Sequence, residues 1–144
     1  MWTQGITIKK VTESAVKRHI DQLVIEKELT IILNNNTVGS LHHTASLEKE
    51  LAIGFLFLKR KISNAIDSVK YFDQDVVIKA KEQSYDAEKI LEFKKPLVHD
   101  VCRLTAFFQE AAILYKKTAV TESAAIADDK NLLFSAEDMS QENA

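Results

Sequence analysis

The feature that most constrains the fold is a run of three asparagines between two β-like segments. Apolar residues alternate with their neighbours along residues 29–33, the period of two expected of a strand with one buried face. Asn34, Asn35 and Asn36 follow, and asparagine favours turns because it tolerates positive φ and hydrogen-bonds its own backbone. A second β-like run at 37–44 can then return antiparallel. The sequence therefore predicts a β-hairpin over residues 29–44.

A helix is predicted directly after this hairpin, over residues 47–60. Ser46 is the predicted N-cap, and Glu48 and Glu50 follow where the helix dipole favours negative charge. Three cations at 59–61 lie at the opposite end, where we interpret them as a solvated C-terminus rather than an anion site. One apolar stripe is predicted to face the core: Leu47, Leu51, Phe55 and Leu58.

The remaining segments predict an α+β fold, with helices packed on a mixed sheet. The first residues show no clear periodicity, so 1–22 are expected to be a loose arm and 23–144 a single domain. The longest helix is expected over 97–116, with Val101, Leu104, Phe108, Ala111 and Tyr115 on one apolar stripe. The other predicted elements are strands at 68–72, 76–80, 122–127 and 132–136, and a short helix from Asp86 through Glu92 that ends before Pro96.

Composition excludes several classes of protein. The net charge of −2 gives no electrostatic reason to expect nucleic acid or an anionic membrane as a partner. The longest apolar run, at 51–58, is far shorter than the ~20 residues of a membrane-spanning helix. No leader-like segment precedes it, and a single cysteine forms no internal disulfide, so a reducing, cytoplasmic setting is expected.

Few side chains point to chemistry on their own. Cys102 lies in the predicted long helix beside its apolar stripe, where a thiol usually behaves as an inert hydrophobe, so it is a weak catalytic candidate. His42 and His43 would face opposite sides of a strand, and no other histidine has a ligand at metal-binding spacing, so no metal site is predicted. Glu137 and Asp138 form an acidic segment that, taken alone, indicates a solvated terminus.

Three segments, the first made of a strand and the helix after it, resemble the formate dehydrogenase accessory protein (FdhD) family. Residues 50–56 (ELAIGFL) are similar to the family's helical "LaiGFL" sequence, and residues 28–34 (ELTIILN) to the strand before it. Residues 118–125 (TAVTESAA) keep the Thr and the two Ala of a "TGGxHaAa" turn, without its Gly pair and His. Residues 137–144 (EDMSQENA) keep the Glu, Asp, Asn and Ala of the "EDvGRHNA" box, without its Gly, Arg and His. The likeness covers about 24–144.

The resemblance implies a cytidine-deaminase-like core, a dimer and a pocket for a guanine nucleotide. Such proteins carry persulfide sulfur from a cysteine desulfurase to the molybdopterin guanine dinucleotide cofactor of formate dehydrogenase. The residues that match the two boxes, and would contact the cofactor or a GDP-like ligand, are Thr118, Glu122, Glu137, Asp138 and Asn143.

The same comparison also implies lost chemistry. The family's CxxC loop is absent between residues 80 and 97, and the family's usual C-terminal extension is missing after Ala144. Gln141 and Glu142 replace cationic positions, which should weaken phosphate binding. We therefore expect a divergent accessory protein in which sulfur transfer is impaired. The alternatives are a catalytically inactive interaction or dimerisation module and, with less support, a metal-dependent deaminase-like enzyme.

Overall fold

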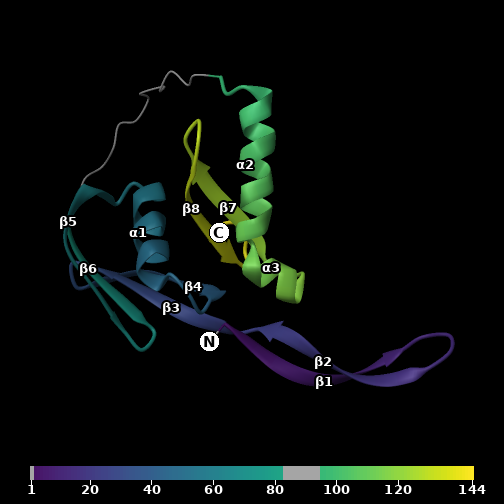
Figure 1. The fold of residues 1–144 in the computed structure, drawn as a ribbon. Helices are drawn as coiled ribbons and strands as arrows, with labels where there is room; N and C mark the ends of the chain where they lie inside the picture. Colours follow the sequence, from purple (N-terminus) through teal and green to yellow (C-terminus); the bar gives the residue numbers. More distant parts are fainter. Residues whose placement is uncertain (1, 83–94) are drawn as a thin grey trace.

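The computed structural model describes residues 2–82 and 95–144. Within these ranges the chain forms three sheets and three helices, a mixed α+β arrangement as the sequence predicts (Figure 1). The expected helix at 86–92 lies outside the described residues. The strands are β1 (Thr3–Val11), β2 (Val16–Val24), β3 (Glu26–Leu33), β4 (Asn36–Thr44), β5 (Ile62–Phe72), β6 (Asp75–Glu82), β7 (Glu122–Ala127) and β8 (Leu132–Asp138). The helices are α1 (Glu48–Leu58), α2 (Val98–Ala111) and α3 (Ile113–Thr118).

The central sheet is mixed, with the strand order β4-β3-β6-β5. β3 and β4 form the predicted antiparallel hairpin, and Asn34 and Asn35 take positive φ values of 47° and 70° in its turn. β3 also pairs in parallel with β6, and β6 pairs antiparallel with β5. The Asn34 side chain extends the pairing beyond β3, because its amide donates to the carbonyl of Ala80 and accepts from the amide of Ala80.

One face of this sheet is buried beneath α1. Alternate residues of β3 and β6 point into the core, as a strand with one covered face requires. Ala52 and Leu56, one turn apart on α1, are fully buried against them. The core consists of Leu29, Ile31, Leu33, Ala52, Leu56, Ile62, Val76, Ile78 and Ala80.

Helix α1 differs from the prediction at both ends and in its buried face. It begins at Glu48 after Leu47, which has a left-handed φ of 55°, and Ser46 makes no capping bond. It ends at Leu58, so the cations at 59–61 follow the helix instead of forming its last turn. The predicted core stripe is right only in part, since Leu51 and Phe55 are partly buried and pack against the core, whereas Leu58 is 75% exposed. The fully buried residues of the helix are Ala52 and Leu56.

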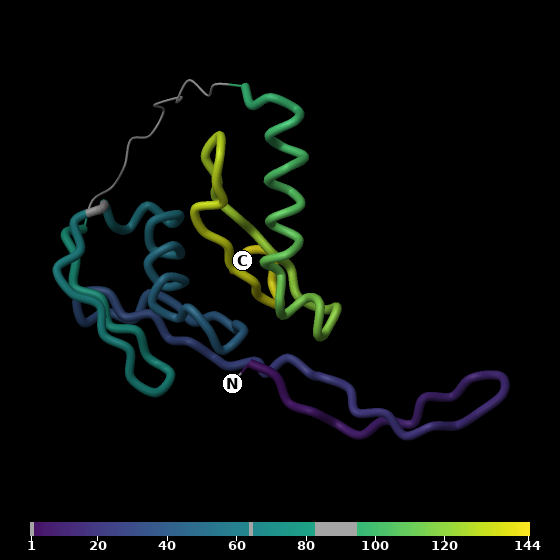
Figure 2. The backbone as a smooth tube through the Cα atoms, viewed as in Figure 1, coloured from purple at the N-terminus to yellow at the C-terminus, as the bar shows by residue number. Residues whose placement is uncertain are grey.

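Most of the segment 1–22, expected to be a loose arm without regular structure, belongs to a long two-stranded ribbon over residues 3–24. β1 and β2 pair antiparallel along their whole length, from Thr3 opposite Val24 to Val11 opposite Val16. The ribbon projects away from the rest of the chain (Figure 2). The two strands escaped prediction because most of their side chains are exposed on both faces, which removes the alternation that marks a strand. The boundary between arm and domain at residues 22 and 23 stays a prediction.

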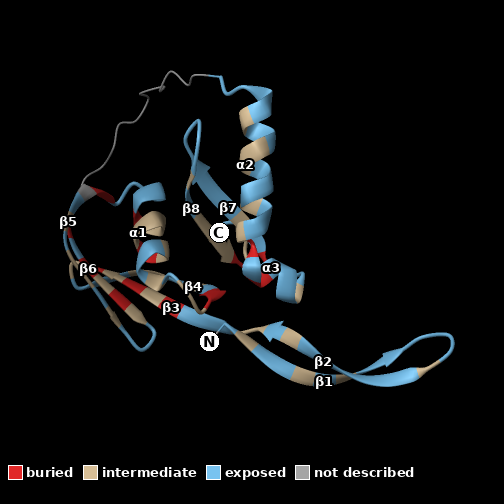
Figure 3. Cartoon of the chain, viewed as in Figure 1, coloured by how far each residue is buried: buried red, intermediate tan, exposed pale blue. Residues whose placement is uncertain are grey.

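The C-terminal part consists of α2, α3 and the β7–β8 hairpin. The single helix predicted over 97–116 is interrupted at Ala112, whose ψ of 71° separates α2 from α3. Arg103 joins α2 to the hairpin turn by donating to the carbonyls of Asp129 and Lys130 at 3.0 and 2.6 Å. No residue of α2 is buried, and most of β7 is exposed (Figure 3). This part therefore carries much less buried surface than the central sheet.

Candidate functional site

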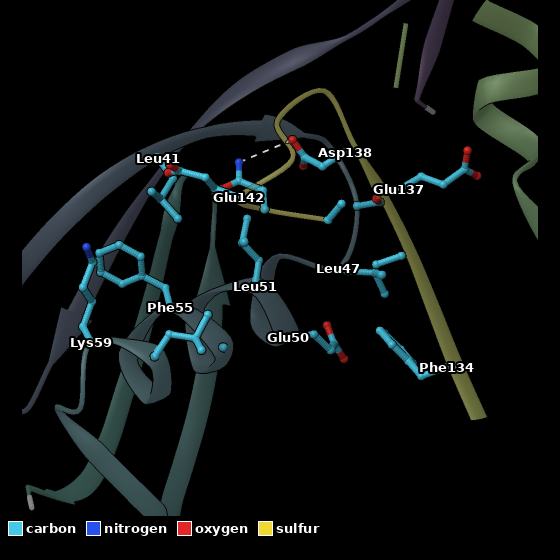
Figure 4. A pocket seen from close by; sticks show the side chains of 16 residues that line it. Leu41, Leu47, Glu50, Leu51, Phe55, Lys59, Phe134, Glu137, Asp138 and Glu142 are labelled. Atoms are coloured by element: carbon cyan, nitrogen blue, oxygen red, sulfur yellow. Dashed lines mark hydrogen bonds between the residues drawn. The ribbon is translucent and has the colours of Figure 1, made fainter. Parts of the chain in front are cut away.

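The C-terminal turn is attached to the end of β4 through Asp138. This carboxylate is almost completely buried and accepts from the backbone N–H of Thr44 at 2.9 Å and of Ser140 at 3.0 Å. The amide of Asn143 donates to the same carboxylate at 3.3 Å, the dashed line in Figure 4, and to the carbonyl of His42 at 2.8 Å. Two residues that the sequence selects as a site, Asp138 and Asn143, thus share one hydrogen-bond network.

Glu137 accepts hydrogen bonds from the start of the neighbouring helix α3. Its carboxylate accepts from the backbone N–H groups of Leu114 and Tyr115 at 2.9 and 2.7 Å, in the first turn of α3. The hydroxyl of Thr121 donates to the same carboxylate at 3.4 Å. Since the first N–H groups of a helix lack partners within the helix, Glu137 satisfies two of them from outside.

The structure brings together some of the predicted site residues but not all. Glu137, Asp138 and Asn143 all line one hollow. Thr118 lies outside this lining, with its hydroxyl donating to the carbonyl of Leu114 within α3. Glu122 also lies outside it, exposed at the start of β7 and opposite Asp138 in the strand register.

This hollow, here called the α1 pocket, is a cavity of about 560 Å³ between α1, the end of β4, β8 and the C-terminal turn (Figure 4). All four residues of the apolar stripe predicted for the core line it, and Leu51 and Phe55 also pack against the core. A second hollow of about 440 Å³ adjoins it, sharing four lining residues with it and reaching Trp2 at the base of the ribbon. The apolar lining of the α1 pocket comprises Leu41, Leu47, Leu51, Phe55, Leu58, Phe134 and Ala136.

Negative charge predominates among the polar residues of the α1 pocket. Glu50 and Glu142 are exposed, and neither carboxylate has a hydrogen-bond or ion-pair partner within residues 2–82 and 95–144. Lys59 is the one cation among the described residues of the lining, with its ammonium 5.7 Å from the centre of the Phe55 ring. A nucleotide phosphate requires cations or free N–H donors. The residues present therefore do not fit a guanine dinucleotide in this pocket.

Cys102 occupies a different environment from the one the sequence predicts. It lies on α2 but is exposed, so the interpretation of a thiol sheltered beside the apolar stripe is wrong. The reason is that α2 buries little of its surface, and Val101 next to Cys102 is itself 45% exposed. Among the described residues, no cluster of three or more His, Cys, Asp and Glu side chains is placed to hold a metal ion.

Sequence reasoning did not predict the burial of one polar residue beside the site. His43 is fully buried, and neither ring nitrogen has a hydrogen-bond partner in the described part of the chain. His42 next to it is exposed, with Nδ1 3.5 Å from the carboxylate of Glu26. The alternation of a strand predicts that the two histidines face opposite sides, but it cannot tell which side is buried.

Comparisons with known proteins identify a shared fold. No protein-family model matches the chain, and neither does any curated protein. Among solved structures, the chain is similar to a protein from Desulfotalea psychrophila described as a "putative formate dehydrogenase accessory protein". The TM-score is 0.82 at 17% sequence identity, with 100% of this chain and 66% of that chain covered. The chain thus spans slightly under two thirds of that structure's length. No helix among the described residues is long and apolar enough to span a bilayer.

Proposed function

We propose that this chain is an accessory protein in the maturation of molybdenum-dependent formate dehydrogenase. The observation that carries the proposal is the fold, which matches that of the Desulfotalea protein along the entire chain. Three of the four FdhD-like ranges give independent support, because residues 28–34, 50–56 and 137–144, unlike 118–125, form neighbouring parts of one structure. The first is β3, the second is in α1, and the third lines the α1 pocket beside that helix.

The proposed role is binding rather than sulfur transfer. Persulfide relay needs a thiolate that reaches both a donor and an acceptor. The sequence has one cysteine and no CxxC, and Cys102 lies within a regular helix, although it is accessible. The cytoplasmic partners proposed from the family resemblance are formate dehydrogenase, the cysteine desulfurase and a second copy of this chain.

The C-terminal part exposes large apolar side chains that are available for such binding. Phe107 and Val101 of α2 and Ile126 of β7 are each close to half exposed or more. Each of these side chains could pack against a partner protein. They also favour the second candidate function, an interaction or dimerisation module without chemistry of its own.

Co-purification with tagged formate dehydrogenase tests the maturation role. We expect the wild-type chain to be retained by the catalytic subunit and to raise formate oxidation in a host that lacks its own accessory protein. Phe107→Asp should reduce retention at least fivefold, because it places a charge on the apolar surface of α2. Gln109→Asp, an equal charge change at another exposed position of α2, is the matched control.

Two further measurements separate the candidate functions. Cys102→Ser should leave maturation unchanged, and a loss of activity would instead assign sulfur transfer to Cys102. A GDP titration followed by thermal unfolding should show no rise in melting temperature, since a specific ligand would stabilise the fold by mass action. Failure of the wild-type chain to bind formate dehydrogenase or raise its activity would contradict the maturation role.

A further inference from the structure

Two surfaces of this chain have complementary chemistry but cannot meet within one molecule. One is the tip of the β1–β2 ribbon, here called the arm tip, and the other is the α1 pocket. We propose that the arm tip of one copy docks in the α1 pocket of a second copy. This inference rests on the homodimer named among the proposed partners, and it identifies the surfaces that form it.

The arm tip combines positive charge with exposed apolar side chains on one face. Lys9 lies directly opposite Arg18, and Val11 lies directly opposite Val16. Residues two apart on a strand share a face, so both pairs lie on the same side of the ribbon. Val11 and Val16 are 72% and 65% exposed. Lys10 lies opposite Lys17 on the other face.

These pairings are unfavourable for an isolated ribbon. Like charges directly opposite each other destabilise a strand pair, and a two-stranded hairpin alone is marginally stable in water. A surface that supplies both negative charge and apolar contact would therefore stabilise the arm tip.

The α1 pocket supplies both. Leu47, Leu51 and Phe55 present apolar surface that no described residue covers completely, and α1 buries Ala52 and Leu56 instead. Glu50 and Glu142 add carboxylates without partners of their own among the described residues. A pair of valines beside a pair of cations on one face of the ribbon matches an apolar hollow bordered by two carboxylates.

The geometry of the arm fits a symmetric pair. Nine paired residues give a ribbon of about 30 Å at about 3.4 Å per residue. The tip thus lies far from its own base, whereas Trp2 at that base lines the hollow adjoining the α1 pocket. When two arms run antiparallel about a two-fold axis, each tip reaches the base of the other arm. The contact is then made twice, as a closed two-fold interface requires.

A charge exchange followed by sedimentation velocity tests the proposal. The wild-type chain should form a dimer at micromolar concentration. The arm variant Lys9→Glu/Arg18→Glu and the pocket variant Glu50→Lys/Glu142→Lys should each weaken dimerisation at least tenfold, because like charges then face each other in both contacts. An equimolar mixture of the two variants should restore the dimer, since each arm then meets a pocket of opposite charge. The matched control, Lys10→Glu/Lys17→Glu, makes the same charge change on the other face of the ribbon and should dimerise like the wild type.

Each other outcome overturns the proposal. If the wild-type chain is a monomer, both this interface and the proposed homodimer are contradicted. The proposed binding to formate dehydrogenase is not affected by that result. If neither charge-reversal variant weakens dimerisation, the interface lies elsewhere. Binding of duplex DNA by the arm of a monomeric chain would identify the ribbon as a nucleic-acid element. A second measurement tests the contact directly by a cross-link. One chain carries Val11→Cys, a second chain carries Leu47→Cys, and both also carry Cys102→Ser. The two introduced cysteines should form a disulfide between the chains.

Discussion

Asp138 accepts a hydrogen bond from the backbone N–H of Thr44 at 2.9 Å, across 94 positions of sequence. The backbone N–H of Met139 returns a bond to the Thr44 hydroxyl at 3.2 Å. These bonds join the C-terminal part to the central sheet, and both residues are buried. The strand β8, which forms part of the wall of the α1 pocket, is therefore attached to the central sheet at its last residue. The acidic segment that sequence alone assigns to solvent is a junction between two parts of the fold.

Replacing Asp138 should weaken this junction. In Asp138→Ala, the buried N–H of Thr44 loses its acceptor, and the turn at Ser140 and Asn143 loses its anchor. We expect a loss of about 2–3 kcal/mol in the free energy of unfolding, since an unsatisfied buried donor costs its desolvation. Urea unfolding measures it. Glu142→Ala, at an exposed acidic position of the same turn, should change stability by less than about 0.5 kcal/mol. Equal effects for both variants would contradict the role of the junction.

Removing the Glu137 carboxylate should loosen α3. Glu137→Ala leaves the N–H groups of Leu114 and Tyr115 without their acceptor. The expected cost is about 1 kcal/mol, as for the loss of a helix N-cap. Hydrogen exchange of those two amides should accelerate, while exchange in the central sheet stays slow. Glu137→Gln keeps one acceptor oxygen and should give an intermediate exchange rate. Unchanged exchange in Glu137→Ala would show that α3 does not depend on this contact.

The sequence predicts the parts of this fold that have a local cause. The three asparagines specify the β3–β4 turn because few residue types accept the positive φ observed at Asn34 and Asn35. The alternation of apolar residues along β3 likewise specifies which face of the strand is buried. Leu29 and Leu33 lie on that face. Both signals lie within a few residues of the structure that they determine.

What the sequence did not predict depends on contacts between distant segments. On α1, two overlapping apolar stripes compete, and the sheet selects the one that carries Leu56 rather than the one that carries Leu58. The break at Ala112 coincides with the contact from Glu137 to the next turn, which no helical periodicity encodes. The predicted site is likewise divided, since Asp138 and Asn143 converge on the pocket whereas Thr118 does not.

Protonation of Asp128 at low pH should weaken the hydrogen bonds that hold the β7–β8 turn. Hydrogen bonds from the backbone N–H groups of Lys130 and Asn131, at 2.7 and 2.6 Å, lower the pKa of this carboxyl below its usual value. Because the folded pKa is depressed, the stabilisation is present above the unfolded pKa and is lost as the pH falls through the folded value. The amide chemical shifts of Lys130 and Asn131 should therefore titrate at a pH below that of an exposed aspartate. In Asp128→Asn this titration should vanish, and its persistence would assign it to another group.

Replacing His43 should stabilise the protein. The imidazole is fully buried, and both ring nitrogens lack partners among the described residues, so the folded state bears their desolvation without compensation. His43→Leu substitutes an apolar side chain of similar size and should raise the free energy of unfolding by about 1–2 kcal/mol, measured by urea unfolding at neutral pH. His42→Leu, at the exposed neighbouring position, is the matched control and should change stability by less than about 0.5 kcal/mol. Destabilisation by His43→Leu would contradict this account and would show that the imidazole binds a partner such as a buried water molecule.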